Sequence, residues 1–167
     1  MRHALTTVWM PTAALRAMLI ETERFAPLET GGVLMGYGAG RFDVVVVQSI
    51  GPGPKAIHDT TRFVPDADFH ETAVADAYST SGRRDVNLGD WHSHPNGSTH
   101  LSARDRRLLK TIAKTVEARM PFPIMAILGG RTSFDLVVWR YVGYIKALRS
   151  GGRTIEKCVV RRYEGAA

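Results

Sequence analysis

The chain has 167 residues, of which 44% are hydrophobic and 23% charged, values typical of one soluble globular domain. Aromatic residues make up 8%, and no repeat or long polar tract occurs, which excludes a fibrous or disordered protein. The net charge of +6 is uneven: residues 1–82 carry 6 basic and 9 acidic side chains, whereas residues 83–167 carry 16 and 7. We therefore expect a single domain over residues 1–167 with a basic second half.

No membrane-spanning segment is expected. The best apolar stretch, residues 4–15, is shorter than the roughly 18 residues that a spanning helix needs, and it contains Pro11. Arg16 argues against a secretory signal, because it interrupts this stretch before any cleavage site of small residues. The one cysteine, Cys158, cannot form an internal disulfide, which is typical of a reducing compartment. These features predict a cytoplasmic protein.

Hydrophobic periodicity and turn residues predict the elements of the first half of the chain. In chain order they are a helix over residues 12–25, a hairpin of strands over 33–37 and 41–50, a loop over 51–59, a short strand over 60–64, and a helix that follows Asp66 and Asp68 and closes at Ser81.

The second half predicts a strand, a long helix and another hairpin. In chain order the elements are a strand over residues 86–92, a helix over 102–119 with Leu108, Leu109, Ile112 and Val116 on one face, strands over 124–128 and 134–141, and a basic edge strand over 154–162. Strands and helices in this order predict an α/β fold, with helices packed on a mixed sheet.

The segment from Asp90 to Asp105 contains the residues most suited to chemistry. His92 and His94 lie on the same face of the predicted strand, because side chains alternate along a strand. Asp105 lies on the apolar stripe of the next helix, where an unpaired carboxylate is costly. Two imidazoles and one carboxylate leave a fourth tetrahedral position for water, which is typical of a catalytic zinc site.

A simpler interpretation of the same residues involves no metal. Ser102-Ala103-Arg104-Asp105 is a sound capping box for the helix that it begins. His92 and His94 could also be two ordinary polar side chains on a strand. Composition alone would very rarely place these two histidines, the proline, Ser102 and Asp105 at this spacing, so the sequence favours the metal site and leaves the capping box open beside it.

The motif resembles that of the JAMM (MPN+) metalloprotease family. In this chain, His92-Ser93-His94-Pro95 is followed after six residues by Ser102-Ala103-Arg104-Asp105, and Glu29-Thr30-Gly31-Gly32-Val33-Leu34-Met35-Gly36 is similar to the family's first strand. The resemblance covers residues 29–140 and is strongest to the prokaryotic JAB branch, found in operons that encode ubiquitin-like proteins with ubiquitin-activating and ubiquitin-conjugating homologues. Some of those operons serve antiviral defence. The fold it implies is the JAMM (cytidine-deaminase-like) α/β sandwich, a curved mixed sheet between helices.

The resemblance also implies a role for each motif residue. His92, His94 and Asp105 would hold one Zn2+ per chain, with a catalytic water as the fourth ligand. Glu29 would be the general base, and Ser102 would stabilise the oxyanion as well as cap its helix. Asp90 shares a strand face with His92, and we expect it to orient that imidazole.

The implied activity is that of an isopeptidase that cleaves after the C-terminal glycine of a ubiquitin-like protein, with residues 51–59 helping to grip that protein. It would serve either deconjugation or precursor processing, beside ubiquitin-activating and conjugating homologues. The alternatives are processing of a sulfur-carrier precursor, a scaffold without activity, and a JAB protein associated with nucleic acid.

Other residues have simpler interpretations. His58, His70 and His100 are interpreted as surface residues, although His100 lies in the loop that borders the site and could meet substrate. Trp91 is interpreted as part of the core or as a support for the metal ligands. No histidine near Cys158 in the sequence supports a thiol-protease mechanism.

Overall fold

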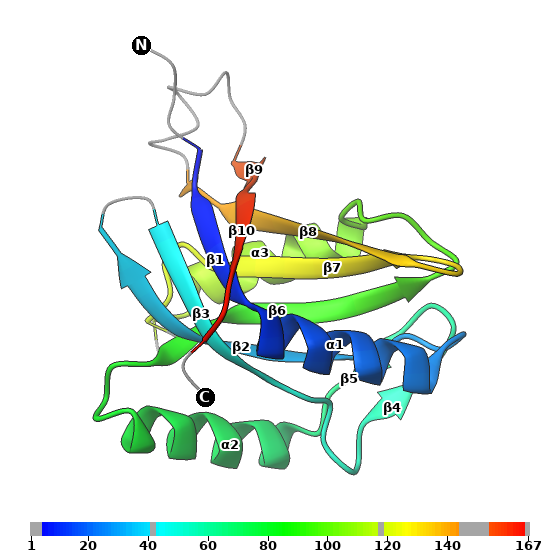
Figure 1. Cartoon of the computed structure of the whole chain (residues 1–167), viewed down its shortest axis with the longest axis horizontal. Coiled ribbons are helices and arrows are strands. Elements are labelled where there is room, and N and C mark those ends of the chain that lie inside the picture. Colours follow the sequence, from blue (N-terminus) through cyan, green and yellow to red (C-terminus); the bar gives the residue numbers. More distant parts are fainter. Residues whose placement is uncertain (1–4, 41–42, 117–118, 144–153, 166–167) are drawn as a thin grey trace.

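The computed structural model describes residues 5–40, 43–116, 119–143 and 154–165 (Figure 1). Helices and strands follow one another in the order β1 (Thr7–Pro11), α1 (Thr12–Phe25), β2 (Gly31–Ala39), β3 (Asp43–Ile50), β4 (Ile57–His58), β5 (Phe63–Val64), α2 (Ala67–Thr80), β6 (Val86–Pro95), α3 (Ala103–Lys114), β7 (Ile124–Gly130), β8 (Phe134–Tyr141), β9 (Ile155–Lys157) and β10 (Val159–Tyr163).

Eight of the strands form one mixed sheet in the order β10-β1-β3-β2-β6-β7-β8-β9, and β4 and β5 form a separate hairpin. β9 and β10 lie at opposite edges of the sheet although only Cys158 separates them. The main chain makes this crossing directly, since Cys158 N–H donates to Val138 O at 2.8 Å and Val159 N–H donates to Thr6 O at 2.9 Å. The sheet is therefore strongly curved and nearly closed on itself.

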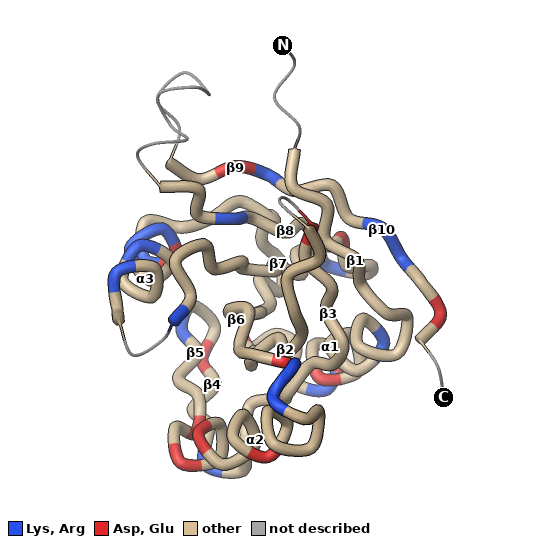
Figure 2. Tube along the Cα trace, turned by 90° about the vertical axis from the view of Figure 1, so that its left-hand side faces the viewer, with Lys and Arg blue, Asp and Glu red and all other residues tan. Residues whose placement is uncertain are grey.

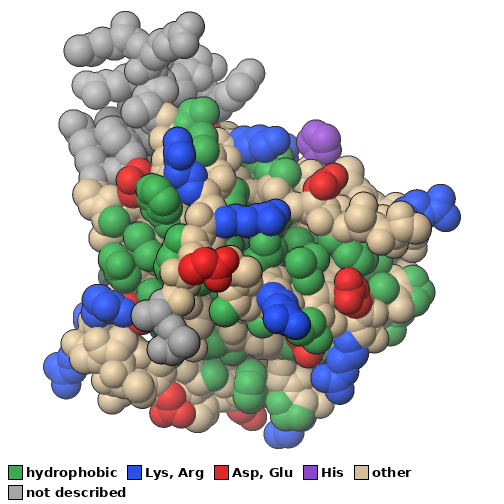
Figure 3. All heavy atoms as spheres, in the orientation of Figure 1, with side chains coloured by type: hydrophobic (Ala, Val, Ile, Leu, Met, Phe, Trp, Pro, Cys, Tyr) green, Lys and Arg blue, Asp and Glu red, His purple; other side chains and the backbone are tan. Residues whose placement is uncertain are grey.

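Helix α1 covers the inner face of this curved sheet. Its buried residues Ala14, Leu15 and Met18 follow the helical three-and-four spacing and pack on buried side chains that include Leu34 and Trp91. Figure 1 shows α1 lying in front of the sheet, and Figure 3 shows that this side of the molecule carries charges of both signs among apolar side chains.

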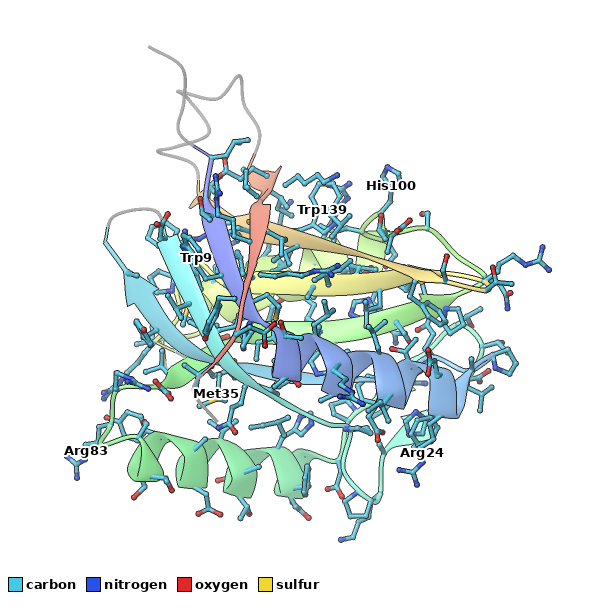
Figure 4. All side chains as sticks on the ribbon, in the orientation of Figure 1. Trp9, Arg24, Met35, Arg83, His100 and Trp139 are labelled. Carbon is cyan, nitrogen blue, oxygen red and sulfur yellow. The ribbon has the colours of Figure 1, made fainter. Side chains whose placement is uncertain are left out.

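Helices α2 and α3 cover two different parts of the outer face. α2 packs on Val33 and Met35 of β2, and Figure 4 shows Met35 between the sheet and this helix. α3 places Leu109 in a cluster with Met125 and Ile127 of β7. β6 lies between β2 and β7, so the part of the outer face between the two helices belongs to β6.

The structure confirms the α/β fold expected from the sequence, a curved mixed sheet between helices. The predicted helix over residues 12–25 and the predicted strand over 134–141 match α1 and β8. β6 continues to Pro95, three residues beyond its predicted end, so that both His92 and His94 lie within the strand.

Several predicted boundaries were wrong. α3 ends at Lys114, not at residue 119, and Leu108 (41% exposed) and Val116 (82% exposed) do not lie on a buried face with Leu109. β1 was not predicted. The strand predicted over residues 60–64 is reduced to β5, which pairs with β4 inside the predicted loop.

The predicted edge strand over residues 154–162 is two strands at opposite edges of the sheet. In the part of the chain that the structure describes, no helix has the length and apolar character needed to cross a membrane.

We expect Leu34→Ala to lower the free energy of unfolding by about 2 to 5 kcal/mol, because Leu34 is fully buried between α1 and the sheet and its truncation leaves a cavity. Ile20→Ala is the control, since Ile20 is 54% exposed on α1 and its truncation should change stability by at most about 0.5 kcal/mol. Urea denaturation measures both. Equal effects would contradict this assignment of the core.

Candidate active site

The two histidines of β6 project from the outer face of the sheet, between α2 and α3. Ser93, which separates them, points inward and is fully buried. Their neighbours on adjoining strands include glycines: His92 lies opposite Gly31 of β2, and His94 lies opposite Gly129 of β7. A Cβ atom at Gly31 would approach His92 Cβ to 2.9 Å, so glycine at this position leaves room for the imidazole.

Asp105 reaches the histidines from the first turn of α3 and is buried. It also completes a capping box, because Asp105 N–H donates to Ser102 Oγ at 3.2 Å and Ser102 N–H donates to Asp105 Oδ2 at 2.7 Å. Asp105 Oδ1 lies 3.4 Å from His92 Nε2. The cap and the cluster therefore coexist, and the two interpretations left open by the sequence are compatible.

The three side chains form a compact donor set. His92 Nε2 and His94 Nε2 are 3.0 Å apart, and the distance from His94 Nε2 to Asp105 Oδ2 is 3.8 Å. Donors bound tetrahedrally to one zinc ion at 2.0 to 2.1 Å would be about 3.3 Å apart, which is close to these separations. Two nitrogens and one carboxylate within 4.8 Å of one another could thus hold a metal ion.

The protonation of these groups suits a cation. His94 Nδ1 lies 2.8 Å from the carbonyl oxygen of Ser98 and donates to it, so in the neutral ring Nε2 carries the lone pair. Burial lowers the pKa of His94, which keeps the ring neutral. Burial alone would raise the pKa of Asp105. This effect is outweighed by the hydrogen bond and charge of His92 and by the hydrogen bonds of Ser102, so the pKa of Asp105 lies below its usual value.

The loop between β6 and α3 fixes the orientation of His94. Besides the bond from His94 to Ser98 O, Trp139 Nε1 on β8 donates to Thr99 O at 3.0 Å. Figure 4 shows Trp139 near His100, and their ring centres are 6.4 Å apart. Sequence reasoning missed Ser98 and Trp139, because neither belongs to a motif.

Glu29 lies in the segment just before β2 and lines the same pocket as the three metal-ligand candidates. The next residue, Thr30, is bonded to the residue between the histidines: Thr30 N–H donates to Ser93 Oγ at 3.0 Å, and Ser93 N–H donates to Thr30 O at 2.8 Å. Burial raises the pKa of Glu29, and the nearby His92 offsets part of that rise. The carboxyl group is thereby adjusted toward the basicity that proton transfer near neutral pH requires.

The pocket has a volume of about 360 Å3 and brings all five predicted site residues together. Its lining comprises Glu29, Gly32, Thr61, Phe63, Pro65, His70, Asp90, Trp91, His92, His94, Ser102, Arg104, Asp105 and Leu108. Hairpin β4–β5 and α3 thus contribute walls, and β6 contributes the floor. Figure 2 shows that the charges on α2 are mainly acidic and those on α3 mainly basic.

Trp91 and the three histidines outside the motif that the structure describes differ in how far they are buried. Trp91 is core, as expected, and its indole N–H donates to Ile50 O at 3.0 Å. His100 is exposed, as expected, but His58 and His70 are half-buried, and each has a ring nitrogen near a main-chain carbonyl, at 3.0 Å from Glu29 O and 2.8 Å from Gly51 O.

Asp90 lies in the pocket and Cys158 outside it. Among the described residues, no hydrogen bond joins Asp90 to His92, so the orienting role expected for Asp90 lacks support; burial raises the pKa of its carboxyl group. Cys158 is buried in the inner core, away from the pocket.

An α/β sandwich that holds two histidines and an aspartate in one pocket defines a class of metal-dependent hydrolases. Residues 11–142 match the model of the prokaryotic homologues of the JAB domain, and the chain belongs to this family. It is therefore an enzyme, a metallopeptidase or isopeptidase of the JAMM type, as the sequence motif predicted.

Known relatives agree with this assignment. The chain is 40% identical over 124 residues to "Probable metalloprotease y4qB" of Sinorhizobium fredii. The aligned region covers 74% of this chain and 76% of that protein. It is 27% identical over 128 residues to "CD-NTase/cGAS isopeptidase" of Enterobacter hormaechei, covering 76% and 69%. The solution structure of protein DSY2949 from Desulfitobacterium hafniense has the same fold, with a TM-score of 0.68 and 20% identity over 96% of this chain and 94% of that one.

We expect Asp105→Asn to bind much less zinc than the wild type, because the amide removes the charge of one ligand while it can still accept the hydrogen bond from Ser102 N–H. Ser102→Ala is the converse variant. It should keep the zinc but lose about 1 kcal/mol of stability, since the Oγ atom that caps the helix is gone. Elemental analysis and urea denaturation separate the two effects, and full zinc occupancy in Asp105→Asn would contradict the ligand set.

We expect Gly129→Ala to weaken zinc affinity about tenfold, as is typical when a group that orients a ligand is disturbed. A Cβ atom there would lie 2.7 Å from the main chain of Ser98 and would displace the carbonyl group that holds His94. Gly38→Ala is the matched control, because a Cβ atom at Gly38 meets no atom within 4 Å. Competition with a chelating dye measures both affinities, and equal affinities would show that the loop does not support His94.

Proposed function

We propose that this protein is a zinc-dependent isopeptidase that cleaves after the C-terminal glycine of a ubiquitin-like protein, in deconjugation or in precursor processing. The observation that carries this proposal is the meeting of Glu29 and Ser102 with His92, His94 and Asp105 in one pocket. A metal site, a carboxyl base and a hydroxyl donor are the three groups that amide hydrolysis of this type requires.

In this proposal, His92, His94 and Asp105 hold the metal, and each remaining group has its own task. A zinc ion bound there would supply an acidified water and polarise the carbonyl group of the substrate. Glu29 takes the proton of the attacking water on its carboxylate and passes it to the leaving amine nitrogen. The pKa of Glu29, raised by burial, makes the carboxylate a stronger base and its acid form a usable donor.

Ser102 is suited to stabilise the developing oxyanion. Its Oγ atom accepts a hydrogen bond from Asp105 N–H, which leaves the hydroxyl hydrogen free to donate toward the pocket. The capping bond at the same time fixes the position of Oγ, so the donor needs little reorganisation during the reaction.

Two observations support a conjugate of a ubiquitin-like protein as the substrate. Hairpin β4–β5 is a sheet separate from the main one and lines the pocket through Phe63, so an extended C-terminal tail could pair with the hairpin as an added strand. Relatives carry the name isopeptidase for CD-NTase/cGAS proteins, which agrees with cleavage of a bond between a protein tail and another protein. The partners in this proposal include ubiquitin-activating and conjugating homologues in the cytoplasm.

We expect Glu29→Gln to keep its zinc and its fold but to lose at least about 100-fold in kcat, because the amide cannot accept the proton of the water. The assay uses a ubiquitin-like protein joined through its C-terminal glycine either to a lysine side chain or to the N-terminus of a reporter. Turnover of the isopeptide substrate supports deconjugation, and turnover of the linear fusion alone supports processing. Undiminished turnover by Glu29→Gln would remove Glu29 from the mechanism.

A further inference from the structure

We infer that His58 is a positioning residue, which fixes the main chain of Glu29 and so holds the base in place. This inference rests on the proposed role of Glu29 in proton transfer. It assigns a second task to hairpin β4–β5: besides lining the pocket, the hairpin fastens the segment that carries the base.

Two hydrogen bonds join the hairpin to both main-chain groups of Glu29. Glu29 N–H donates to Asp59 O at 2.7 Å, and His58 Nδ1 lies 3.0 Å from Glu29 O, where it can only donate because the partner is a carbonyl oxygen. Glu29 lies outside any helix or strand, so no sheet ladder would otherwise fix its N–H and C=O groups. The hairpin takes the place of that ladder.

The ring of His58 is itself held in position. It stacks on Phe25, the last residue of α1, with ring centres 3.7 Å apart and planes inclined by 11°. It also contacts Phe63, its partner across the hairpin, at 5.5 Å between ring centres and with planes inclined by 38°. Because the ring packs against two aromatic side chains, Nδ1 has little freedom to leave the carbonyl group of Glu29.

The turn of the hairpin is built to present Asp59 O to Glu29. Asp59 N–H donates to Arg62 O at 2.8 Å, which closes the turn, and the Asp59 carboxylate accepts from Thr60 N–H at 2.6 Å. The carbonyl group of Asp59 is thereby left to accept from Glu29 N–H.

Glu29 is consequently held between two anchors. On one side the hairpin binds its N–H and C=O groups, and on the other side Thr30 is bonded to Ser93, between the two metal-ligand candidates. The bonds between Thr30 and Ser93 fix the position of the segment relative to the metal site. The bonds from the hairpin fix the orientation of the Glu29 main chain, and therefore the direction in which its side chain projects. Loss of the His58 bond should therefore move the Glu29 carboxyl group without disturbing His92, His94 or Asp105.

The test compares two substitutions of His58. His58→Phe keeps a ring to stack on Phe25 but cannot donate to Glu29 O, whereas the side-chain amide of His58→Asn can place a donor near the position of Nδ1. We expect His58→Phe to lower kcat about tenfold with KM changed at most about twofold, because misplacing a reacting group by a fraction of an ångström costs about this much. His58→Asn should recover most of the lost kcat, and both variants should keep their zinc.

A second readout needs no substrate. Hydrogen exchange of the Glu29 amide should be faster in His58→Phe than in the wild type, and close to the wild-type rate in His58→Asn. Tyr163→Phe is the control, because it removes a side-chain hydrogen bond to a main-chain carbonyl, that of Val46 at 2.7 Å, in another part of the molecule. It should change neither kcat nor exchange at Glu29.

The outcomes separate this inference from the proposed function. If the wild type cleaves its substrate and His58→Phe matches it in kcat, the positioning role is wrong. The role is equally wrong if exchange at Glu29 is the same in all variants. If the wild type cleaves none of the fusions, the proposed function fails, whereas the exchange rates still decide whether His58 fixes Glu29.

Discussion

The burial of Trp91 is the constraint on which the site depends. Its side chain is 1% exposed on the inner face of the sheet, and its indole N–H is bonded to Ile50 O. Because strand side chains alternate, a buried Trp91 and a buried Ser93 oblige His92 and His94 to face outward together. A slip of β6 by one residue would expose the largest buried side chain of the core and place both imidazoles inside it. The register of the metal site is thus fixed by hydrophobic burial and not by the histidines.

Hydrogen bonds of main-chain groups position the remaining site groups. Asp105 is placed by the cap of α3, His94 by the carbonyl group of Ser98, and the segment of Glu29 by Ser93. Each of these bonds engages a main-chain N–H or C=O group, so the same contacts that stabilise the loops also orient the reacting groups. Asp105 does both, since it belongs to the capping box and to the metal-ligand set.

The sequence predicts well what depends on neighbouring residues. The period of α1, the alternation of β6 and the spacing of His92, His94 and Asp105 are local patterns, and the structure brings these three side chains together as expected. It predicts poorly what depends on distant pairing: β1 and β10 are short strands that are stabilised by each other, and the hairpin strands β4 and β5 have two residues each. His58 and Trp139 belong to no motif, because their partners are carbonyl groups of loops whose course only the folded chain defines.

The folded chain also changes the interpretation of the basic second half. Within the described residues, the largest group of its cationic side chains lies on α3, two more lie on β10, which Figure 2 places on the opposite side of the molecule, and the others are distributed over further elements and loops. A nucleic-acid footprint requires a continuous basic surface, commonly with aromatic side chains between the charges, and α3 contains no aromatic residue. Figure 2 instead shows hairpin β4–β5 between α2, whose charged residues are acidic, and α3, whose charged residues are mainly basic. A protein bound along the hairpin would meet acidic residues on one side and basic residues on the other. This arrangement favours a partner that carries charges of both signs, in one orientation, and disfavours a uniformly charged polymer.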